Sequence, residues 1–206
     1  MKSNIIEFKK FKLKTTQDVF FPRDDVEIFP KALKGIIKCN NRILELGTGT
    51  GAISIAIAKN FSDIEIIATD INLSALRIAK ENAKLNKVDK IIEFKKSNWF
   101  SELEKNKFDF IISNPPYLSK KNSTHYVELS DPENSLYAKN NGLDDIYKII
   151  KLGVNYLHKD SYIIIEHSHN QTLMIKNYAK KYKLTLLKSE KDTLGFNRVS
   201  IFSNRF

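Results

Sequence analysis

A short apolar run that passes directly into an alternating glycine loop constrains the fold of this 206-residue chain more than any other feature. The run at 43–46 has the length and composition of a buried strand, and the alanine- and isoleucine-rich segment 52–58 indicates a helix. Between them, Gly47, Gly49 and Gly51 lack a Cβ, so the chain can turn sharply and a ligand can approach the backbone closely. The segment therefore predicts a strand, a glycine-rich turn and a helix that together cradle a cofactor.

Strand-like and helix-like segments alternate along the rest of the chain. Further strands are predicted at 64–69, 91–95, 108–113, 162–166, 184–187 and 198–202, and helices at 73–83, with Asn72 as N-cap, 143–156 and 171–182. Such alternation is typical of an α/β fold, here a mostly parallel seven-stranded sheet with helices on both faces. The carboxyl ends of parallel strands meet at one rim, so residues 47–51, 70, 97–99 and 114–117 should converge there.

The glycine spacing and a downstream carboxylate distinguish two classes of cofactor, a dinucleotide and S-adenosylmethionine. The sequence Gly-Thr-Gly-Thr-Gly at 47–51 lacks the Gly-x-Gly-x-x-Gly spacing that receives a pyrophosphate on a helix N-terminus. Asp70 lies 19 residues after Gly51, at the end of the second predicted strand, where a carboxylate can accept from both ribose hydroxyls. Glu45 has two interpretations, an acceptor for the amino group of a methionine moiety or a cap of the strand end. The pattern favours S-adenosylmethionine.

The sequence Asn-Pro-Pro-Tyr at 114–117 follows the fourth predicted strand. Two consecutive prolines remove backbone donors and hold the segment extended, which presents the Asn114 side-chain amide and the Pro115 carbonyl rigidly at the rim. Two fixed acceptor oxygens can hold the N–H groups of an amino or amide nitrogen so that its lone pair points at an electrophilic methyl carbon. Tyr117 offers a flat face for a planar group. The motif predicts methyl transfer to a planar nitrogen.

These motifs resemble those of the peptide chain release factor glutamine N5-methyltransferases, the PrmC/HemK family of class I S-adenosylmethionine-dependent methyltransferases. The resemblance extends from about Val19 to Phe202, and its pieces are Phe21-Pro22-Arg23, Ile43 to Ile57, Asp70, Trp99-Phe100, Ser113 to Tyr117, Asp131-Pro132-Glu133, Asn141-Gly142-Leu143, Ile165-Glu166-His167 and Asn197-Arg198-Val199. Other nitrogen methyltransferases share the glycine loop and Asn-Pro-Pro-Tyr, whereas the remaining pieces are similar to this family in particular.

The resemblance implies a Rossmann-like fold, methylation of the glutamine in the Gly-Gly-Gln loop of release factors, and a role for each matching residue. It implies cofactor binding by Gly47, Thr48, Gly49, Thr50, Gly51, Asp70, Asn98, Trp99 and Asn114, a catalytic role for Asn114, Pro115 and Tyr117, and substrate binding by Asn114, Pro115, Pro116 and Tyr117. The implied products are a methylated release factor and S-adenosylhomocysteine. Release factors act in translation termination, so the implied process is protein methylation in translation termination. No metal is expected, because no Cys and His spacing suggests one.

Three departures from the family pattern lead to further expectations. The family usually begins with a helical substrate domain, whereas some 20 residues precede Pro22 here. Residues 1–30 are therefore expected to be a remnant of, or lead-in to, that helical domain, and 31–206 the S-adenosylmethionine-dependent methyltransferase domain. Asn98 stands where an acidic residue is common, and it can still accept from the adenine amino group through its carbonyl oxygen. Asp24-Asp25 follows the Pro-Arg pair where a proline and an acid are more usual.

Charge and composition leave other interpretations open. Residues 1–42 carry a net charge of +5 and 171–206 carry +6, around a middle of −1, which suits an anionic partner or proximity to the ribosome or RNA. The alternatives to release-factor methylation are therefore methylation of an exocyclic amine of adenine or guanine in RNA or DNA, and a non-catalytic cofactor-binding scaffold. No apolar run reaches the roughly 18 residues that a membrane helix needs, and the N-terminus lacks the apolar region of a signal peptide, so a cytoplasmic protein without membrane contact is expected. We also expect a monomer whose lone cysteine, Cys39, is buried.

Overall fold

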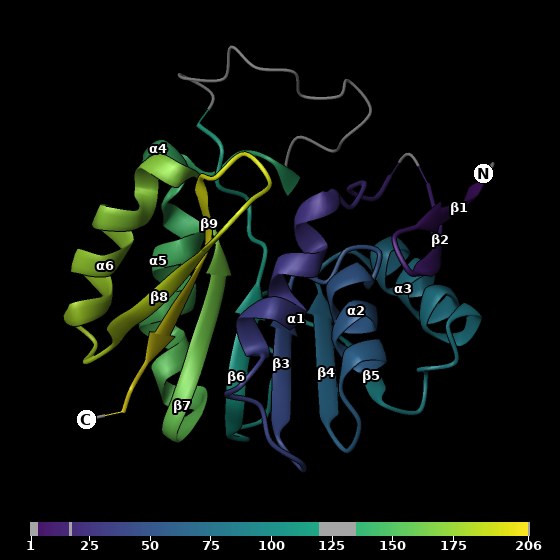
Figure 1. The fold of residues 1–206 in the computed structure, drawn as a ribbon, viewed down its shortest axis with the longest axis horizontal. Coiled ribbons are helices and arrows are strands. Elements are labelled where there is room, and N and C mark those ends of the chain that lie inside the picture. Colours follow the sequence, from purple (N-terminus) through teal and green to yellow (C-terminus); the bar gives the residue numbers. More distant parts are fainter. Residues whose placement is uncertain (1–3, 17, 120–134, 206) are drawn as a thin grey trace.

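Seven strands form one sheet in the order β5, β4, β3, β6, β7, β9, β8 in a computed structural model, which describes residues 4–16, 18–119 and 135–205 (Figure 1). The strands are β3 (Arg42–Leu46), β4 (Glu65–Asp70), β5 (Ile92–Lys96), β6 (Phe108–Ser113), β7 (Leu157–Glu166), β8 (Thr185–Lys191) and β9 (Asn197–Ser203). All neighbouring pairs from β5 to β7 are parallel, whereas β9 is antiparallel to both β7 and β8. The predicted α/β class and mostly parallel seven-stranded sheet are confirmed.

Helices pack on both faces because successive strand residues point to opposite sides of the sheet. On one face, Ile43 and Phe110 contribute to a core with α1 (Ile28–Leu33), α2 (Ala52–Asn60) and part of α3 (Leu73–Leu85). On the other face, the neighbouring residues Leu44 and Ile111 pack with α5 (Asp144–Gly153) and α6 (Thr172–Lys180). The remaining turns of helix are α4 (Lys139–Gly142) and 3₁₀ segments at Asp24–Glu27, Val154–Tyr156 and His169–Gln171. Within the described ranges, no helix is long and apolar enough to cross a membrane.

The strand order places the functional loops. Strand β3 connects through α2 to β4 on one side, whereas β6 lies on its other side, so the direction of the connections reverses between β3 and β6. Ligands bind in open α/β sheets at the carboxyl ends of the strands where this reversal occurs. The glycine loop after β3 and the Asn-Pro-Pro-Tyr segment after β6 therefore flank the same crevice.

An antiparallel hairpin precedes the sheet and was not predicted. Its strands are β1 (Asn4–Phe8) and β2 (Phe11–Thr15), and they form a separate two-stranded sheet. The turn between them lacks the Gly or Asn that usually signals a hairpin, and Lys9 instead adopts a φ of 53°. Phe8, Phe11 and Leu13 are buried and belong to the same core as α1 and α2, and β2 packs on α3.

Other local expectations need correction. Strand β7 begins at Leu157 rather than residue 162, because Leu157 also pairs with Phe108 before a shift in register. The helix expected at 143–156 is α-helical only to Gly153 and ends in a 3₁₀ turn. Cys39 is exposed, so its predicted burial is wrong: it lies in the turn that leads into β3, where the chain crosses the surface.

Candidate functional site

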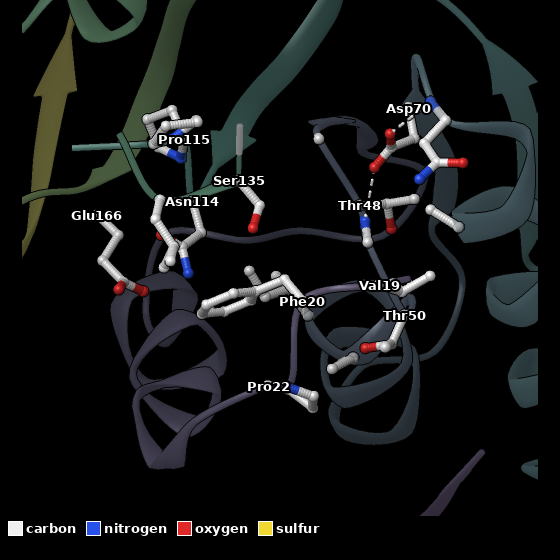
Figure 2. Close-up of a pocket in the computed structure, with 18 of the residues that line it drawn as sticks. Val19, Phe20, Pro22, Thr48, Thr50, Asp70, Asn114, Pro115, Ser135 and Glu166 are labelled. Carbon is white, nitrogen blue, oxygen red and sulfur yellow. Dashed lines mark hydrogen bonds between the residues drawn. The ribbon is translucent and has the colours of Figure 1, made fainter. Parts of the chain in front are cut away.

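One pocket at the carboxyl rim of the sheet collects most of the residues singled out in the sequence (Figure 2). Its lining includes Gly47, Thr48, Gly49, Thr50, Asp70, Trp99, Asn114, Pro115, Pro116 and Tyr117. The side chain of Asn114 lies across the pocket from Asp70 and Thr48 in Figure 2. Two predicted residues are not among the lining: Gly51, which is the N-cap of α2, and Asn98, which is exposed.

The glycine loop requires glycine for two different reasons. Gly49 has a φ of 55°, and a Cβ built there would meet no atom within 4 Å, so the loop backbone borders open space at that point. Gly51 has a φ of 81° and its Cβ would lie 3.1 Å from the Ala79 Cβ, so this glycine lets α2 and α3 approach closely. Gly49 thus faces a space that a ligand can fill, whereas Gly51 serves packing.

Asp70 holds the glycine loop from the end of β4. Its Oδ2 accepts from the Gly49 backbone N–H at 2.9 Å, and its Oδ1 accepts from Asn72 at 2.8 Å. Burial raises the pKa of Asp70 above its usual value, and these backbone donors oppose the shift. An ionised carboxylate has about four acceptor positions, so each oxygen retains capacity for a ligand hydroxyl. Asn72 also caps α3 as predicted, since its Oδ1 accepts from Ser74.

Two residues from other elements fix the end of the Asn-Pro-Pro-Tyr segment. The side-chain amide of Gln171 is buried and donates to the carbonyls of Tyr117 and Asn141, both at 3.0 Å. Gly142 has a φ of 83°, and a Cβ there would lie 2.0 Å from the Tyr117 carbonyl oxygen, which no side chain can tolerate. The tyrosine main chain is therefore held by contacts 25 to 54 residues away. Neither residue was predicted to act at the site, although Gly142 belongs to one of the family-like pieces.

The N-terminal part of the chain supplies another wall of the pocket. Val19, Phe20 and Pro22 line it, and Figure 2 shows Phe20 between Asn114 and the glycine-loop side. The Arg23 guanidinium lies 5.8 Å from the centre of the Phe20 ring. Phe21, the next residue after Phe20, is exposed. The sequence could not tell whether the phenylalanine pair belongs to the core or covers the cofactor, and the structure assigns Phe20 to the pocket wall.

Glu45 lies buried beneath the glycine loop rather than in the pocket wall. Its Oε2 accepts from the hydroxyls of Thr48, at 2.8 Å, and Ser54. Its Oε1 is the one buried side-chain oxygen or nitrogen of the described residues that lacks a hydrogen-bond partner. Burial raises the pKa of Glu45 to about 7, against the effect of the Ser54 and Thr48 hydrogen bonds. Glu45 therefore braces the loop through Thr48, and a further role as acceptor for a methionine amino group or as cap of the strand end stays a prediction.

Asparagines on α3 connect the N-terminal hairpin to the glycine loop. Asn82 is buried; its Oδ1 accepts from the Lys14 backbone N–H at 2.6 Å, and its Nδ2 donates to the carbonyls of Lys14, at 3.0 Å, and Thr50, at 2.9 Å. One helical turn later, Asn86 pairs in the same way with the backbone of Lys12. Local periodicity identified this helix but could not indicate that its asparagines bind a strand and a ligand loop.

The structure gives the buried His167 hydrogen-bond partners outside the pocket. His167 is buried, with Nε2 2.7 Å from the Ser200 hydroxyl and Nδ1 2.8 Å from the Ser168 carbonyl. Burial lowers the pKa of His167 to about 4, so this ring is neutral at physiological pH and serves a structural role. In the parts of the chain that the structure covers, no group of His, Cys, Asp and Glu is arranged to hold a metal. The family-like piece Asp131-Pro132-Glu133 and His125 lie outside the described residues.

The fold and the pocket together define a class I methyltransferase. A solved methyltransferase from Pyrococcus furiosus has a similar fold, with a TM-score of 0.66 at 22% identity over 87% of this chain and 81% of that chain. Residues 11–129 match the family described as Methyltransferase small domain.

Sequence relatives narrow the class. The release factor glutamine methyltransferase of Buchnera aphidicola subsp. Acyrthosiphon pisum is 40% identical over 199 residues, which cover 95% of this chain and 71% of that relative. The enzyme of the same name from Aliivibrio fischeri is 34% identical over 200 residues, covering 95% of this chain and 70% of that relative. The protein is a methyltransferase, and it belongs to the release factor glutamine methyltransferase family.

Proposed function

We propose that the protein transfers a methyl group from S-adenosylmethionine to the side-chain amide nitrogen of the glutamine in the Gly-Gly-Gln loop of peptide chain release factors. The observation that carries the proposal is the shared pocket: the Gly49 and Asp70 side and the Asn114 to Tyr117 side border one space. Membership in the family supports the choice of substrate.

In this proposal, the glycine-loop side of the pocket holds the cofactor. The open space at Gly49 admits a ligand against the backbone, and the spare acceptor positions of Asp70 suit two ribose hydroxyls. Trp99 also lines this side and offers an aromatic surface to the adenine. When bound, S-adenosylmethionine supplies a methyl group attached to a positively charged sulfur. The cofactor roles of Gly51 and Asn98 stay predictions, and Gly51 acts through the position of α2.

The Asn114 side of the pocket holds and orients the glutamine amide. Asn114 offers its side-chain oxygen and Pro115 its carbonyl, two acceptors for the two amide N–H groups, while Tyr117 provides a flat surface for the planar amide. Holding both N–H groups sets the direction of the nitrogen lone pair. The proton can leave to water after methylation, so the mechanism needs no strong base. His167, whose pKa is lowered to about 4 by burial, does not line the pocket and has no part in this mechanism.

One experiment separates this proposal from its alternatives. The protein is incubated with S-adenosylmethionine that carries a stable-isotope label in its methyl group and either a purified bacterial release factor or total nucleic acid, and the label is located by mass spectrometry. Label on the Gly-Gly-Gln glutamine supports the proposal. Label on nucleic acid alone would instead assign methylation of an adenine or guanine amine, and cofactor binding without any label would assign the scaffold.

A further inference from the structure

A buried carboxyl group borders the pocket behind Tyr117. Glu166 lies at the end of β7, is 3% exposed and lines the pocket together with Asn114 and Tyr117. Its Oε1 accepts a hydrogen bond from the Tyr117 hydroxyl at 2.9 Å. In Figure 2 the carboxyl group of Glu166 lies beside Asn114 and points toward the pocket. The sequence places Glu166 in one of the segments that resemble the family, but it predicts no role for this residue.

The surroundings of Glu166 do not explain it as a simple ion-pair residue. The nearby Arg198 guanidinium pairs with Asp192 at 2.9 Å and with Asp25 at 3.8 Å. Burial, together with the charge of Asp25, raises the pKa of Glu166 to about 8, although the Tyr117 hydroxyl, Arg198 and Arg23 act in the opposite direction. A carboxyl group is costly to bury, so its retention at a ligand pocket indicates a functional use.

That use follows from how the Tyr117 side chain is held. Gln171 and Gly142 fix the carbonyl of Tyr117, and Glu166 fixes the hydroxyl at the far end of the ring. The two restraints fix the direction of the long axis of the ring, and because a phenolic O–H prefers the ring plane, the hydrogen bond to Glu166 also favours one rotation of the ring face about that axis. Burial and the neighbouring Glu166 raise the pKa of Tyr117 well above its usual value, so the hydroxyl keeps the proton that it donates. The direction of the ring face is therefore set by a residue that follows Tyr117 by 49 positions.

We propose that Glu166 is a positioning residue for methyl transfer, which holds the Tyr117 ring in the orientation that receives the substrate amide. This inference rests on the proposed function, because it concerns the glutamine side of the same pocket. Either protonation state of Glu166 can accept from the Tyr117 hydroxyl, so the role depends on the hydrogen bond rather than on a negative charge.

The test compares Glu166→Ala, Glu166→Gln and Tyr117→Phe, with steady-state kinetics on a release factor and calorimetry with S-adenosylhomocysteine. Glu166→Ala should lower kcat roughly 10- to 100-fold, because a misplaced reactant loses orientation, while KM and cofactor Kd change less than about threefold. Glu166→Gln retains an acceptor oxygen and should stay within about threefold of the parent kcat. Glu190→Ala is the matched control, since Glu190 pairs with Lys31 and Lys188 and does not line the pocket.

The double variant Glu166→Ala, Tyr117→Phe decides whether the two residues act together. If Glu166 acts through the tyrosine hydroxyl, the double variant should be no slower than the slower single variant. Three results would each overturn the proposal. They are a kcat in the double variant that falls by the product of the two single reductions, an equal loss of kcat in Glu166→Ala and Glu166→Gln, and an unchanged kcat in Glu166→Ala.

A spectroscopic measurement keeps the inference separate from the proposed substrate. With ¹³Cζ-labelled tyrosine, the Tyr117 signal, assigned from the Tyr117→Phe spectrum, should shift in Glu166→Ala and return toward the parent value in Glu166→Gln. An unmoved Tyr117 signal would overturn the inference whatever the substrate is. Failure of the parent protein to methylate a release factor, with the signal moving as expected, would refute the proposed function and leave the positioning of Tyr117 by Glu166 established.

Discussion

At the scale of single residues, the pocket divides into a side that binds the cofactor and a side that orients the substrate. Asp70 belongs to the first side, where it also holds the Gly49 backbone. Asn114 belongs to the second side, at the end of β6. This division predicts that substitutions on the two sides have different kinetic signatures.

Replacing Asp70 should weaken cofactor binding. In Asp70→Ala, two acceptor oxygens for the ribose are lost and the Gly49 N–H loses its partner, which together should raise the Kd for S-adenosylhomocysteine roughly 30-fold, about 2 kcal/mol. Calorimetry measures this change. Asp89→Ala, an exposed residue after α3, serves as the control and should bind like the parent protein. An unchanged Kd in Asp70→Ala would remove this residue from the cofactor site.

Replacing Asn114 should instead impair turnover. Asn114→Ala removes one of the two acceptors proposed to orient the amide, so kcat should fall by about 100-fold or more while the Kd for S-adenosylhomocysteine changes little. Single-turnover kinetics and calorimetry on the same preparations give the two numbers. Parallel losses in kcat and cofactor affinity would mean that Asn114 is a binding residue only.

At the scale of elements, α3 connects the N-terminal hairpin to the cofactor loop. Asn82 and Asn86 bind the backbone of alternate strand residues, Lys14 and Lys12, with the same side-chain groups, but only Asn82 also donates to the Thr50 carbonyl. Asn86 therefore attaches only the hairpin, whereas Asn82 both attaches the hairpin and supports the glycine loop.

This difference gives a matched comparison of Asn82→Ala with Asn86→Ala. Asn82→Ala leaves the buried Thr50 carbonyl and half-buried backbone groups of Lys14 without these partners, so the free energy of unfolding should fall by about 2–3 kcal/mol and cofactor affinity should also fall. Asn86→Ala affects contacts at more exposed groups and should lower stability by less than about 1 kcal/mol, with cofactor affinity retained. Urea unfolding and calorimetry test both variants, and equal cofactor affinities in the two would contradict a role for Asn82 in supporting the loop.

At the scale of the whole molecule, the lysines of the N-terminal hairpin lie far from the basic C-terminal segment, although α1 of the same N-terminal segment contacts β8 and β9. The hairpin of β1 and β2 packs near α3, while β8 forms the far edge beyond β9 (Figure 1). The hairpin lysines and the C-terminal basic residues both contribute to the long-range field.

A protein with this charge distribution should attract an anionic substrate in a salt-dependent way. We expect kcat/KM for a release factor to fall with ionic strength while kcat stays nearly constant, because exposed charges are screened over about 8 Å at physiological salt. Replacing Lys9, Lys10, Lys12 and Lys14 with Gln should flatten the dependence. A kcat/KM that does not vary with salt in the parent protein would show that these lysines serve solubility alone.

Buried carboxyls should make the fold less stable at mildly alkaline pH. The folded-state pKa values of Glu45, about 7, and Glu166, about 8, lie above the unfolded value near 4.5, so the folded state binds these protons more tightly. Their contribution is fully present below the unfolded pKa and is lost as pH rises through 7 and 8. His167, with its pKa lowered to about 4, acts in the opposite sense, but only below about pH 6.5.

The free energy of unfolding should therefore decrease from about pH 6.5 to pH 8.5, as measured by urea unfolding of the cofactor-free protein. Glu166→Gln removes one titrating group and should make the decrease smaller. The same slope in the parent protein and in Glu166→Gln would show that Glu166 does not titrate in this range.

The sequence by itself determined the features that depend on neighbouring residues. Hydrophobic runs and their spacing predicted the seven strands and the main helices, because burial on a sheet or helix face repeats over a few positions. Glycine spacing at 47–51 and the two prolines at 115–116 restrict the local backbone directly, so the ligand loops were recognisable without a structure. The division of the chain at residue 30 stays a prediction.

Only the tertiary structure decided which distant groups complete the site. Tyr117 is held by Glu166 and Gln171, which follow it by 49 and 54 positions, and Asn82 reaches Lys14 across 68 positions. The wall formed by Val19 and Phe20 likewise comes from a segment with no recognisable periodicity. Such contacts depend on strand order and on how helices pack over the sheet, and a local pattern carries no information about which of many polar side chains will meet across that distance.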